Sequence, residues 1–163
     1  MADALTIRPA AEEDYSAACA LLDELDALHR EELPRVFRDP ETVARSRDYV
    51  GSILADDDQA LLLAEGDGEA VGLAHAAMRE SRDFPILVAR RSAVVENLVV
   101  APAWRRRGVG RRLMDAVEAW AQERGASEIE LNVWEFNRQA VGFYQVLGYQ
   151  TVSRRMWKRL ADE

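Results

Sequence analysis

Two glycines and a cluster of arginines lie together in the second half of the chain. Residues 105–112 read Arg-Arg-Arg-Gly-Val-Gly-Arg-Arg. Glycine lets the main chain come close to a phosphate, and the unpaired N–H groups at the start of a helix attract an anion. The segment therefore predicts a phosphate-binding turn. It is not a Walker loop, because no Gly-Lys-Ser/Thr ends it, and it lacks the third glycine of a dinucleotide fingerprint.

A carboxylate interrupts an otherwise apolar segment just before that turn. Residues 93–100 read Ala-Val-Val-Glu-Asn-Leu-Val-Val, with Glu96 among aliphatic side chains. A carboxylate within a mostly buried strand must be solvated, paired or functional. The sequence leaves open whether Glu96 is a general base, a substrate-binding group or one half of a structural ion pair.

The other residue types that could do chemistry are scattered. His29 and His75 are far apart and belong to no ligand-spaced set, and Cys19 is the only cysteine. A disulfide within the chain and a thiolate metal cluster are therefore excluded. We expect no metal site.

The charge is distributed unevenly. The net charge is −8, but residues 1–83 hold 20 acidic and 8 basic side chains, whereas residues 84–163 hold 9 acidic and 13 basic ones. A basic half suits a phosphorylated cofactor, and an acidic half would attract a cation. Alternatively, the acidic residues are the solvated faces of two helices. A sequence pI near 4.9, with no RNA-binding motif, argues against a nucleic-acid partner.

The composition indicates one globular domain spanning residues 1–163. The chain is 48% hydrophobic and 31% charged. No apolar run approaches the roughly 20 residues that span a membrane, and no secretory signal opens the sequence. We expect a cytoplasmic protein without a membrane partner, and the sequence allows a homodimer.

Apolar periodicity and breakers predict ten elements around these residues. The order is βααβββαβαβ, a mixed α/β domain in which helices cover both faces of a central, mostly antiparallel sheet. Strands are expected at 5–8, 59–65, 69–78, 93–100, 129–134 and 149–160, and helices at 12–30, 42–54, from the glycine turn to Gly125, and from Asn137 to Gly148.

Two motifs in this frame resemble the GNAT superfamily of acetyl-CoA-dependent N-acetyltransferases. The family signature Arg/Gln-x-x-Gly-x-Gly/Ala after a Val-x-Pro strand end matches Val100–Gly110. A second signature, Asn-x-x-Ala-x-x-Phe-Tyr-x-x-x-Gly-Phe, matches the residues from Asn137 onward, with Tyr149 in place of the final Phe. The element order also agrees, so the resemblance covers essentially the whole chain.

The resemblance implies a site for acetyl-CoA. In such proteins the loop amides bind the pyrophosphate, the pantetheine arm lies along the fourth strand, and a bulge, expected here near Val99, frees an amide that polarises the thioester carbonyl. The cofactor-binding residues are then Leu98, Val99, Val100, Arg105, Arg106, Arg107, Gly108, Val109, Gly110, Arg111, Asn137 and Phe143.

The same resemblance implies catalytic roles. Tyr144 matches the frequent general acid that protonates the departing thiolate, although a tyrosine packed on an amphipathic helix would give the same pattern. Glu96 lies close to a strand glutamate of many relatives and is the candidate base. We expect acetyl transfer by direct attack. A regulatory protein that binds CoA without turnover is the alternative.

The acceptor is expected to be a primary amine on a small cationic molecule or a basic peptide. In relatives the first two helices and their connecting loop form the acceptor wall. Here that wall gives the substrate-binding candidates His29, Glu32 and Phe37, to which Trp134 is added. For His29, a hydrogen-bonded residue at the edge of an apolar helix face remains an alternative.

Overall fold

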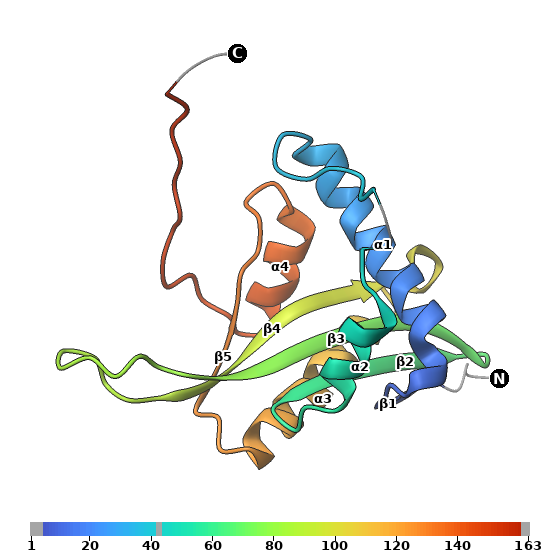
Figure 1. The fold of residues 1–163 in the computed structure, drawn as a ribbon, viewed down its shortest axis with the longest axis horizontal. Coiled ribbons are helices and arrows are strands. Elements are labelled where there is room, and N and C mark those ends of the chain that lie inside the picture. The colour runs from blue at the N-terminus through green and yellow to red at the C-terminus, as the bar shows by residue number, and fades with distance from the viewer. Residues whose placement is uncertain (1–4, 42–43, 161–163) are drawn as a thin grey trace. The chain divides into compact units, whose positions relative to one another are not determined.

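The computed structural model describes residues 5–41 and 44–160. The chain falls into two compact parts, Met1–Asn132 and Val133–Glu163. The first part holds the sheet and three α-helices, and the second holds one helix and the C-terminal segment (Figure 1). The single domain expected from the sequence stays a prediction.

Five strands form one sheet in chain order. They are β1 (Thr6–Pro9), β2 (Gln59–Gly66), β3 (Glu69–Glu80), β4 (Arg91–Val100) and β5 (Glu128–Leu131). The first four are antiparallel, and only β4 and β5 run parallel. Asp67 and Gly68 both have positive φ, as a tight hairpin turn between β2 and β3 requires. The expected mostly antiparallel sheet is confirmed.

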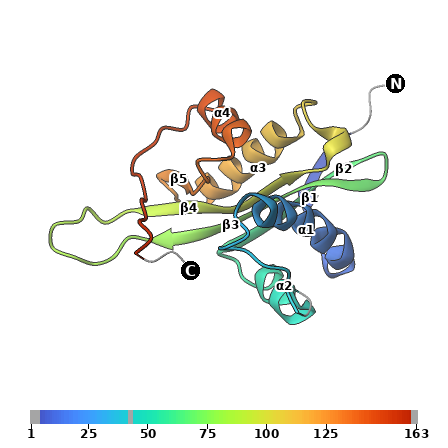
Figure 2. The same ribbon diagram turned by 90° about the horizontal axis from the view of Figure 1, so that it is seen from above.

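The helices of the first part cover both faces of this sheet, as expected. They are α1 (Tyr15–Glu32), α2 (Arg47–Leu54) and α3 (Val109–Glu123). Figure 2 shows α1 and α2 on one face and α3 on the other. A 3-10 turn (Glu12–Asp14) leads into α1, and a second one (Pro102–Trp104) follows β4.

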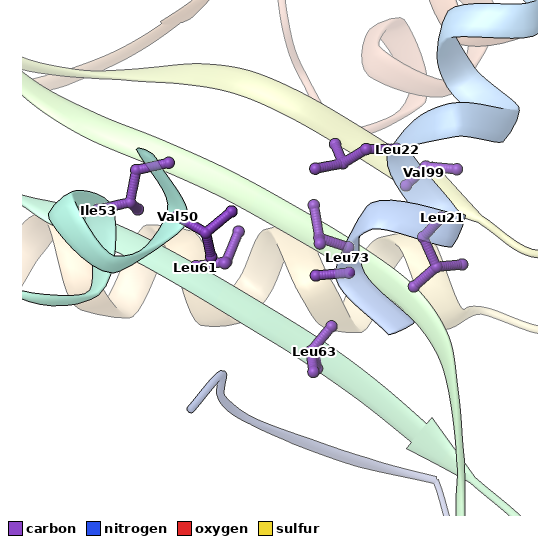
Figure 3. Close-up of a cluster of buried hydrophobic side chains, with 9 residues drawn as sticks. Leu21, Leu22, Val50, Ile53, Leu61, Leu63, Leu73 and Val99 are labelled. Atoms are coloured by element: carbon purple, nitrogen blue, oxygen red, sulfur yellow. The ribbon is translucent and has the colours of Figure 1, made fainter. Parts of the chain in front are cut away.

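An aliphatic cluster holds α1 and α2 against the sheet (Figure 3). Leu22 of α1 and Ile53 of α2 are each 5% exposed, and Leu63 and Leu73 of the sheet are fully buried. Alternation along a strand places every second residue on one face. Up to the bulge after Ala64, the odd-numbered residues of β2 and β3 therefore face α1 and α2, and the even-numbered ones face α3. Beyond that bulge the alternation in β3 shifts, and Ala70 packs against the aliphatic cluster.

The bounds of α1 and α2 differ from the sequence prediction. The second helix was expected from residue 42, but α2 begins at Arg47, where the Ser46 side chain accepts a hydrogen bond from the Tyr49 N–H. Residues 42 and 43 lie outside the described residues. The first helix extends two residues further than expected, to Glu32. At the start of α2 a cap, rather than apolar periodicity, sets the boundary.

The second part contains α4 (Arg138–Val146), which Asn137 caps as the sequence predicts. Its side-chain oxygen accepts the Ala140 N–H at 3.1 Å. Gly148 has φ +94°, and the Tyr149 N–H returns to the Tyr144 carbonyl. A left-handed glycine with such a return hydrogen bond is a common way to end a helix.

The strand expected at residues 149–160 is wrong, because these residues form no strand and residues 150–160 are exposed (Figure 1). The segment carries apolar residues such as Val152, Met156 and Leu160, but a strand also needs a main-chain partner. The fifth strand is also shorter than expected, since β5 ends at Leu131 rather than at residue 134. Within the described residues, no helix has the length and apolarity to cross a membrane.

Candidate functional site

A β-bulge in β4 shapes the centre of the candidate site. His75 of β3 pairs with Asn97, but the next residue, Ala76, pairs with Val95, so Glu96 is the extra residue. A bulge was expected near Val99, three residues later; there the pairing of Val99 with Leu73 is regular. Sequence alone could not place the bulge, because register is a property of two strands.

The bulge turns two consecutive polar side chains toward the same face of the sheet. Asn97 faces His75, whose ring nitrogen Nδ1 lies 3.5 Å from the Asn97 amide nitrogen. Glu96 reaches Arg79, another odd-numbered residue of β3. A bulge is known to re-aim side chains in this way. Glu96 and Asn97 therefore both lie on the face that carries α1 and α2.

Glu96 is one half of an ion pair in this structure. Its Oε1 accepts a hydrogen bond from a guanidinium nitrogen of Arg79 at 3.0 Å, and its side chain is 36% exposed. Of the interpretations that the sequence left open, the structural ion pair is therefore present. The carboxylate still reaches solvent, so a role as base stays a prediction.

Beyond the bulge, β4 has an open main-chain edge. The pairing of β4 with β5 covers only Ser92 to Val95. The Ala101 N–H donates to the Val71 carbonyl of the neighbouring segment, and main-chain groups point to alternate sides along a strand. The N–H groups of Leu98 and Val100 therefore point away from β3, toward the side where β5 no longer runs alongside.

The open edge leads into the arginine and glycine turn. Arg105 folds back so that its Nε donates to the Val100 carbonyl at 3.0 Å. Arg106 and Gly108 have φ values of +63° and +81°. Left-handed residues in a tight turn gather main-chain N–H groups into a concave anion site. Gly108 is also the N-cap of α3, so the helix dipole adds to this attraction.

The turn is open toward an incoming phosphate. A Cβ placed on Gly108 would meet nothing within 4 Å, and the side chains of Arg106, Arg107 and Arg111 are exposed beside it. Val109 is buried and Gly110 is half-buried in the first turn of α3. The predicted residues from Leu98 to Arg111 therefore lie along one continuous stretch of strand, turn and helix.

Trp104 joins this turn to the hairpin between β2 and β3. Its six-membered ring lies against Gly66, so that a Cβ there would be 2.4 Å from the indole Cη2. The Arg107 guanidinium lies 5.3 Å from the Trp104 ring centroid. In the sequence, the only signal for the contact with the hairpin is a glycine at the end of a strand.

The acceptor candidates of the first part come together at the end of α1. The rings of His29 and Phe37 stack with centroids 5.1 Å apart, and Glu32, the last residue of α1, is exposed nearby in sequence. Burial lowers the pKa of His29, against a smaller opposing effect of Asp26. His29 is therefore a partly buried aromatic neighbour of Phe37 rather than an isolated side chain.

The remaining candidates belong to the second part. Tyr144 packs edge-to-face against Phe143 and Tyr149, with centroids 5.2 Å and 5.5 Å away. Burial raises the pKa of Tyr144 to about 12, so its phenol stays protonated at neutral pH. Trp134 contacts Trp157, with ring centroids 5.9 Å apart. Both interpretations of Tyr144, as proton donor and as packed aromatic, fit this arrangement.

A polar group that was not predicted from the sequence lies beside the bulge. His75 is 6% exposed, and its Nε2 lies 2.9 Å from the Gln59 Oε1 on β2. Its other nitrogen faces Asn97. Gln59, His75 and Asn97 are dispersed in sequence, and only the strand register brings them together.

Comparisons with known proteins agree with this geometry. Residues 22–149 match the Acetyltransferase (GNAT) family. The chain is 32% identical over 109 residues to an aminoglycoside N(6')-acetyltransferase type 1 of Salmonella typhimurium, which covers 66% of this chain and 73% of the relative. An aminoglycoside N(6')-acetyltransferase type 1 of Stenotrophomonas maltophilia is 30% identical over 116 residues, or 68% of this chain and 72% of that protein.

Solved structures share the fold. A mutant of the BH1408 protein of Bacillus halodurans superposes with a TM-score of 0.90 at 22% identity, covering 96% of this chain and 99% of that one. The aminoglycoside 6'-N-acetyltransferase AAC(6')-Ih of Acinetobacter baumannii has a TM-score of 0.75 at 22% identity, covering 98% and 99%. The family match spans most of the chain, both signatures included. The chain therefore belongs to the GNAT family, and it is an acyltransferase with acetyl-CoA as its co-substrate.

Proposed function

We propose that this protein transfers the acetyl group of acetyl-CoA to a primary amine of a small, positively charged molecule. The observation that carries the proposal is the continuous path from the bulge at Glu96, along the open edge of β4, to the turn at Gly108. An extended thioester arm ending in a pyrophosphate needs main-chain groups along its length and an anion site at its end. The path offers both.

The cofactor is held by the chain's own main-chain groups. The N–H groups of Leu98 and Val100 face the open edge and would bond an extended arm as a neighbouring strand does. The turn between Arg106 and Gly108 would hold the pyrophosphate, and the exposed arginines around it would add charge. Asn137 and Phe143 stay predicted cofactor contacts on the evidence of their motif.

Acetyl transfer requires the nitrogen to attack as a neutral amine and the sulfur to leave as a thiol. Glu96 would accept the proton released by the nitrogen, directly or through water, because its carboxylate is solvent-accessible on the face that carries α1. Tyr144 would donate the proton that the thiolate takes up, since its phenol is protonated at neutral pH.

An aminoglycoside or a similar cationic aminosugar is the acceptor class that we favour. Two relatives, at 32% and 30% identity, are aminoglycoside N(6')-acetyltransferases. In this chain, exposed Glu31 and Glu32 end α1, the helix that also carries His29 of the stacked pair with Phe37. Carboxylates next to an aromatic face suit a sugar ring that carries ammonium groups. Peptide amines as acceptors, a contribution of Trp134 and a homodimeric assembly stay predictions.

The test is a screen of amines with release of the CoA thiol as the readout. Cationic aminosugars and polyamines are compared with neutral amines and with acidic amino acids at matched concentration. We expect turnover with the cationic amines and a KM for the amine that rises with ionic strength. A preference for acidic acceptors would contradict the proposed acceptor, and absence of turnover with every amine would contradict the proposed activity.

A further inference from the structure

A chain of polar side chains crosses three strands on the face that carries α1 and α2. Asp56, just before β2, faces Gln59, with Asp56 Oδ2 3.0 Å from Gln59 Nε2. Gln59 Oε1 lies 2.9 Å from His75 Nε2, and His75 Nδ1 lies 3.5 Å from Asn97 Nδ2. This row of polar side chains therefore begins at an exposed carboxylate, passes through a buried imidazole and ends at the bulge of β4.

Which group donates and which accepts along this row of polar side chains follows from the charge of Asp56. An ionised carboxylate only accepts, and the contacts of Asp56 with Gln59 and with the Asp58 N–H lower the pKa of Asp56. Gln59 must therefore donate with its NH₂ group to Asp56 and turn its carbonyl oxygen to His75. His75 Nε2 must then carry the proton.

The neutral imidazole has one donor and one acceptor nitrogen. With the proton on Nε2, Nδ1 of His75 is the acceptor, and it faces the NH₂ group of Asn97. Burial lowers the pKa of His75, which keeps the ring neutral, although Glu96 opposes this effect. The Asn97 carboxamide is thereby oriented with its nitrogen toward His75 and its oxygen, Oδ1, directed away.

Asn97 lies at a position where the attacking amine would need a hydrogen-bond acceptor. It follows Glu96 in the bulge, on the same face of the sheet, and it precedes the open edge that begins at Leu98. Its side chain is half-buried, so it retains access to solvent. An amine that gives its proton to Glu96 carries further N–H groups, and these need an acceptor next to the carboxylate.

We propose that Asn97 is a substrate-binding residue whose Oδ1 accepts a hydrogen bond from the acceptor amine, and that Gln59 and His75 are positioning residues that fix this orientation. The inference rests on the proposed amine acetylation and adds a specificity element to it. An N–H donor at this position could not form a hydrogen bond with the N–H groups of the amine, whereas the carboxamide oxygen can accept one from them.

The orientation is tested first on the unmodified protein, by the tautomer of His75. The chain has two histidines, so long-range ¹H–¹⁵N spectra of ¹⁵N-labelled protein give two ring systems, and a His29→Gln variant identifies the signals of His75. We expect a neutral ring near pH 7.5 with the proton on Nε2. A proton on Nδ1 would turn Asn97 Oδ1 inward and overturn the proposal, whatever the activity.

The coupling is tested next by a double-mutant cycle with the best amine from the screen. Asn97→Ala is expected to raise the KM for the amine about 3–10-fold, the value of one neutral hydrogen bond, with the KM for acetyl-CoA unchanged. Gln59→Leu is expected to raise the KM for the amine less. In the Asn97→Ala background, Gln59→Leu should have no further effect, because it acts only through Asn97.

The outcomes separate the two proposals. If the parent acetylates no amine, the proposed activity fails. If the parent is active but Asn97→Ala leaves the KM for the amine unchanged, or if the effects of the two substitutions simply add, the role of Asn97 fails while the activity stands. Asp57→Asn serves as the control, since Asp57 is exposed beside Asp56 and meets Arg124 through its main-chain carbonyl, which the substitution keeps.

Discussion

The indole ring of Trp104 lies directly against the backbone of Gly66. Three atoms of its six-membered ring would be 2.4 to 2.9 Å from a Cβ at Gly66, closer than any real contact allows. Gly66 ends β2, and Trp104 ends the short 3-10 turn before the arginine and glycine segment. The hairpin and the candidate phosphate turn are therefore fixed to each other through one aromatic ring.

Gly66→Ala should destabilise the protein and weaken acetyl-CoA binding together. Overpacking of this kind typically costs about 1–3 kcal/mol, and here it displaces the ring that precedes the turn. Chemical denaturation measures the first effect and calorimetric titration the second. Gly51→Ala is the control, because a Cβ at this α2 position meets nothing within 4 Å. Unchanged affinity in a folded Gly66→Ala protein would show that the turn does not depend on Trp104.

Gly108→Ala should lower the affinity for acetyl-CoA, whereas Gly125→Ala should not. The two glycines have nearly equal φ values, +81° and +77°, and a Cβ added at either one would meet no atom within 4 Å. The backbone strain of an alanine, about 1–2 kcal/mol, is therefore similar at both. Only Gly108 caps the start of α3, where the phosphate site is proposed. Equal losses of affinity in both variants would contradict that site.

Tyr144→Phe should lower kcat about 10- to 1000-fold while the KM for acetyl-CoA stays near that of the parent. The phenol is proposed to protonate the departing sulfur, so its loss raises the free energy of the transition state. Because burial raises the pKa of Tyr144 to about 12, the parent should show no loss of kcat from this group below about pH 11. An unchanged kcat, with acetyl transfer shown to limit the rate, would remove Tyr144 from the mechanism.

Asp14→Asn should reduce the free energy of unfolding by about 1 kcal/mol or more at neutral pH. Asp14 forms a two-oxygen pair with Arg8 at 2.7 and 2.9 Å and accepts the Ala11 N–H before α1. The pair lowers the pKa of Asp14 from 3.8 to about 2. Its contribution is therefore complete above pH 3.8 and is lost as the pH falls toward 2.

Urea denaturation of parent and Asp14→Asn across this pH range measures that contribution. The difference between the two proteins should shrink as the pH falls from about 4 to 2. Asp23→Asn, at an exposed position of α1, should show no such trend. A constant difference would mean that the carboxylate charge of Asp14 does not stabilise the fold.

Most of the fold could be predicted from the sequence because each element leaves a local signal. Helix α3 has glycine at both ends, the hairpin has Asp67 and Gly68, and Asn137 caps α4 as its motif indicates. The segment 149–160 shows the limit of such signals. Its residue types describe side chains, but a strand is defined by main-chain partners that the sequence pattern cannot supply.

The candidate site was predictable only where it is contiguous. The stretch from Leu98 to Arg111 could be identified directly, because strand end, turn and helix follow one another. His75 and Asn97 could not be paired in advance, since the bulge at Glu96 shifts the register by one residue. If the pairing of Ala76 with Val95 is extended without that shift, Glu96 rather than Asn97 is assigned to the position opposite His75.

Leu98 and Val100 offer main-chain groups at the open edge of β4, so substitutions of their side chains, proline excepted, leave the N–H donors in place. Asn97, by contrast, offers a side chain that a point substitution replaces. A lineage carrying this scaffold could thus exchange one acceptor for another by ordinary point mutation while its hold on the acetyl donor stayed intact.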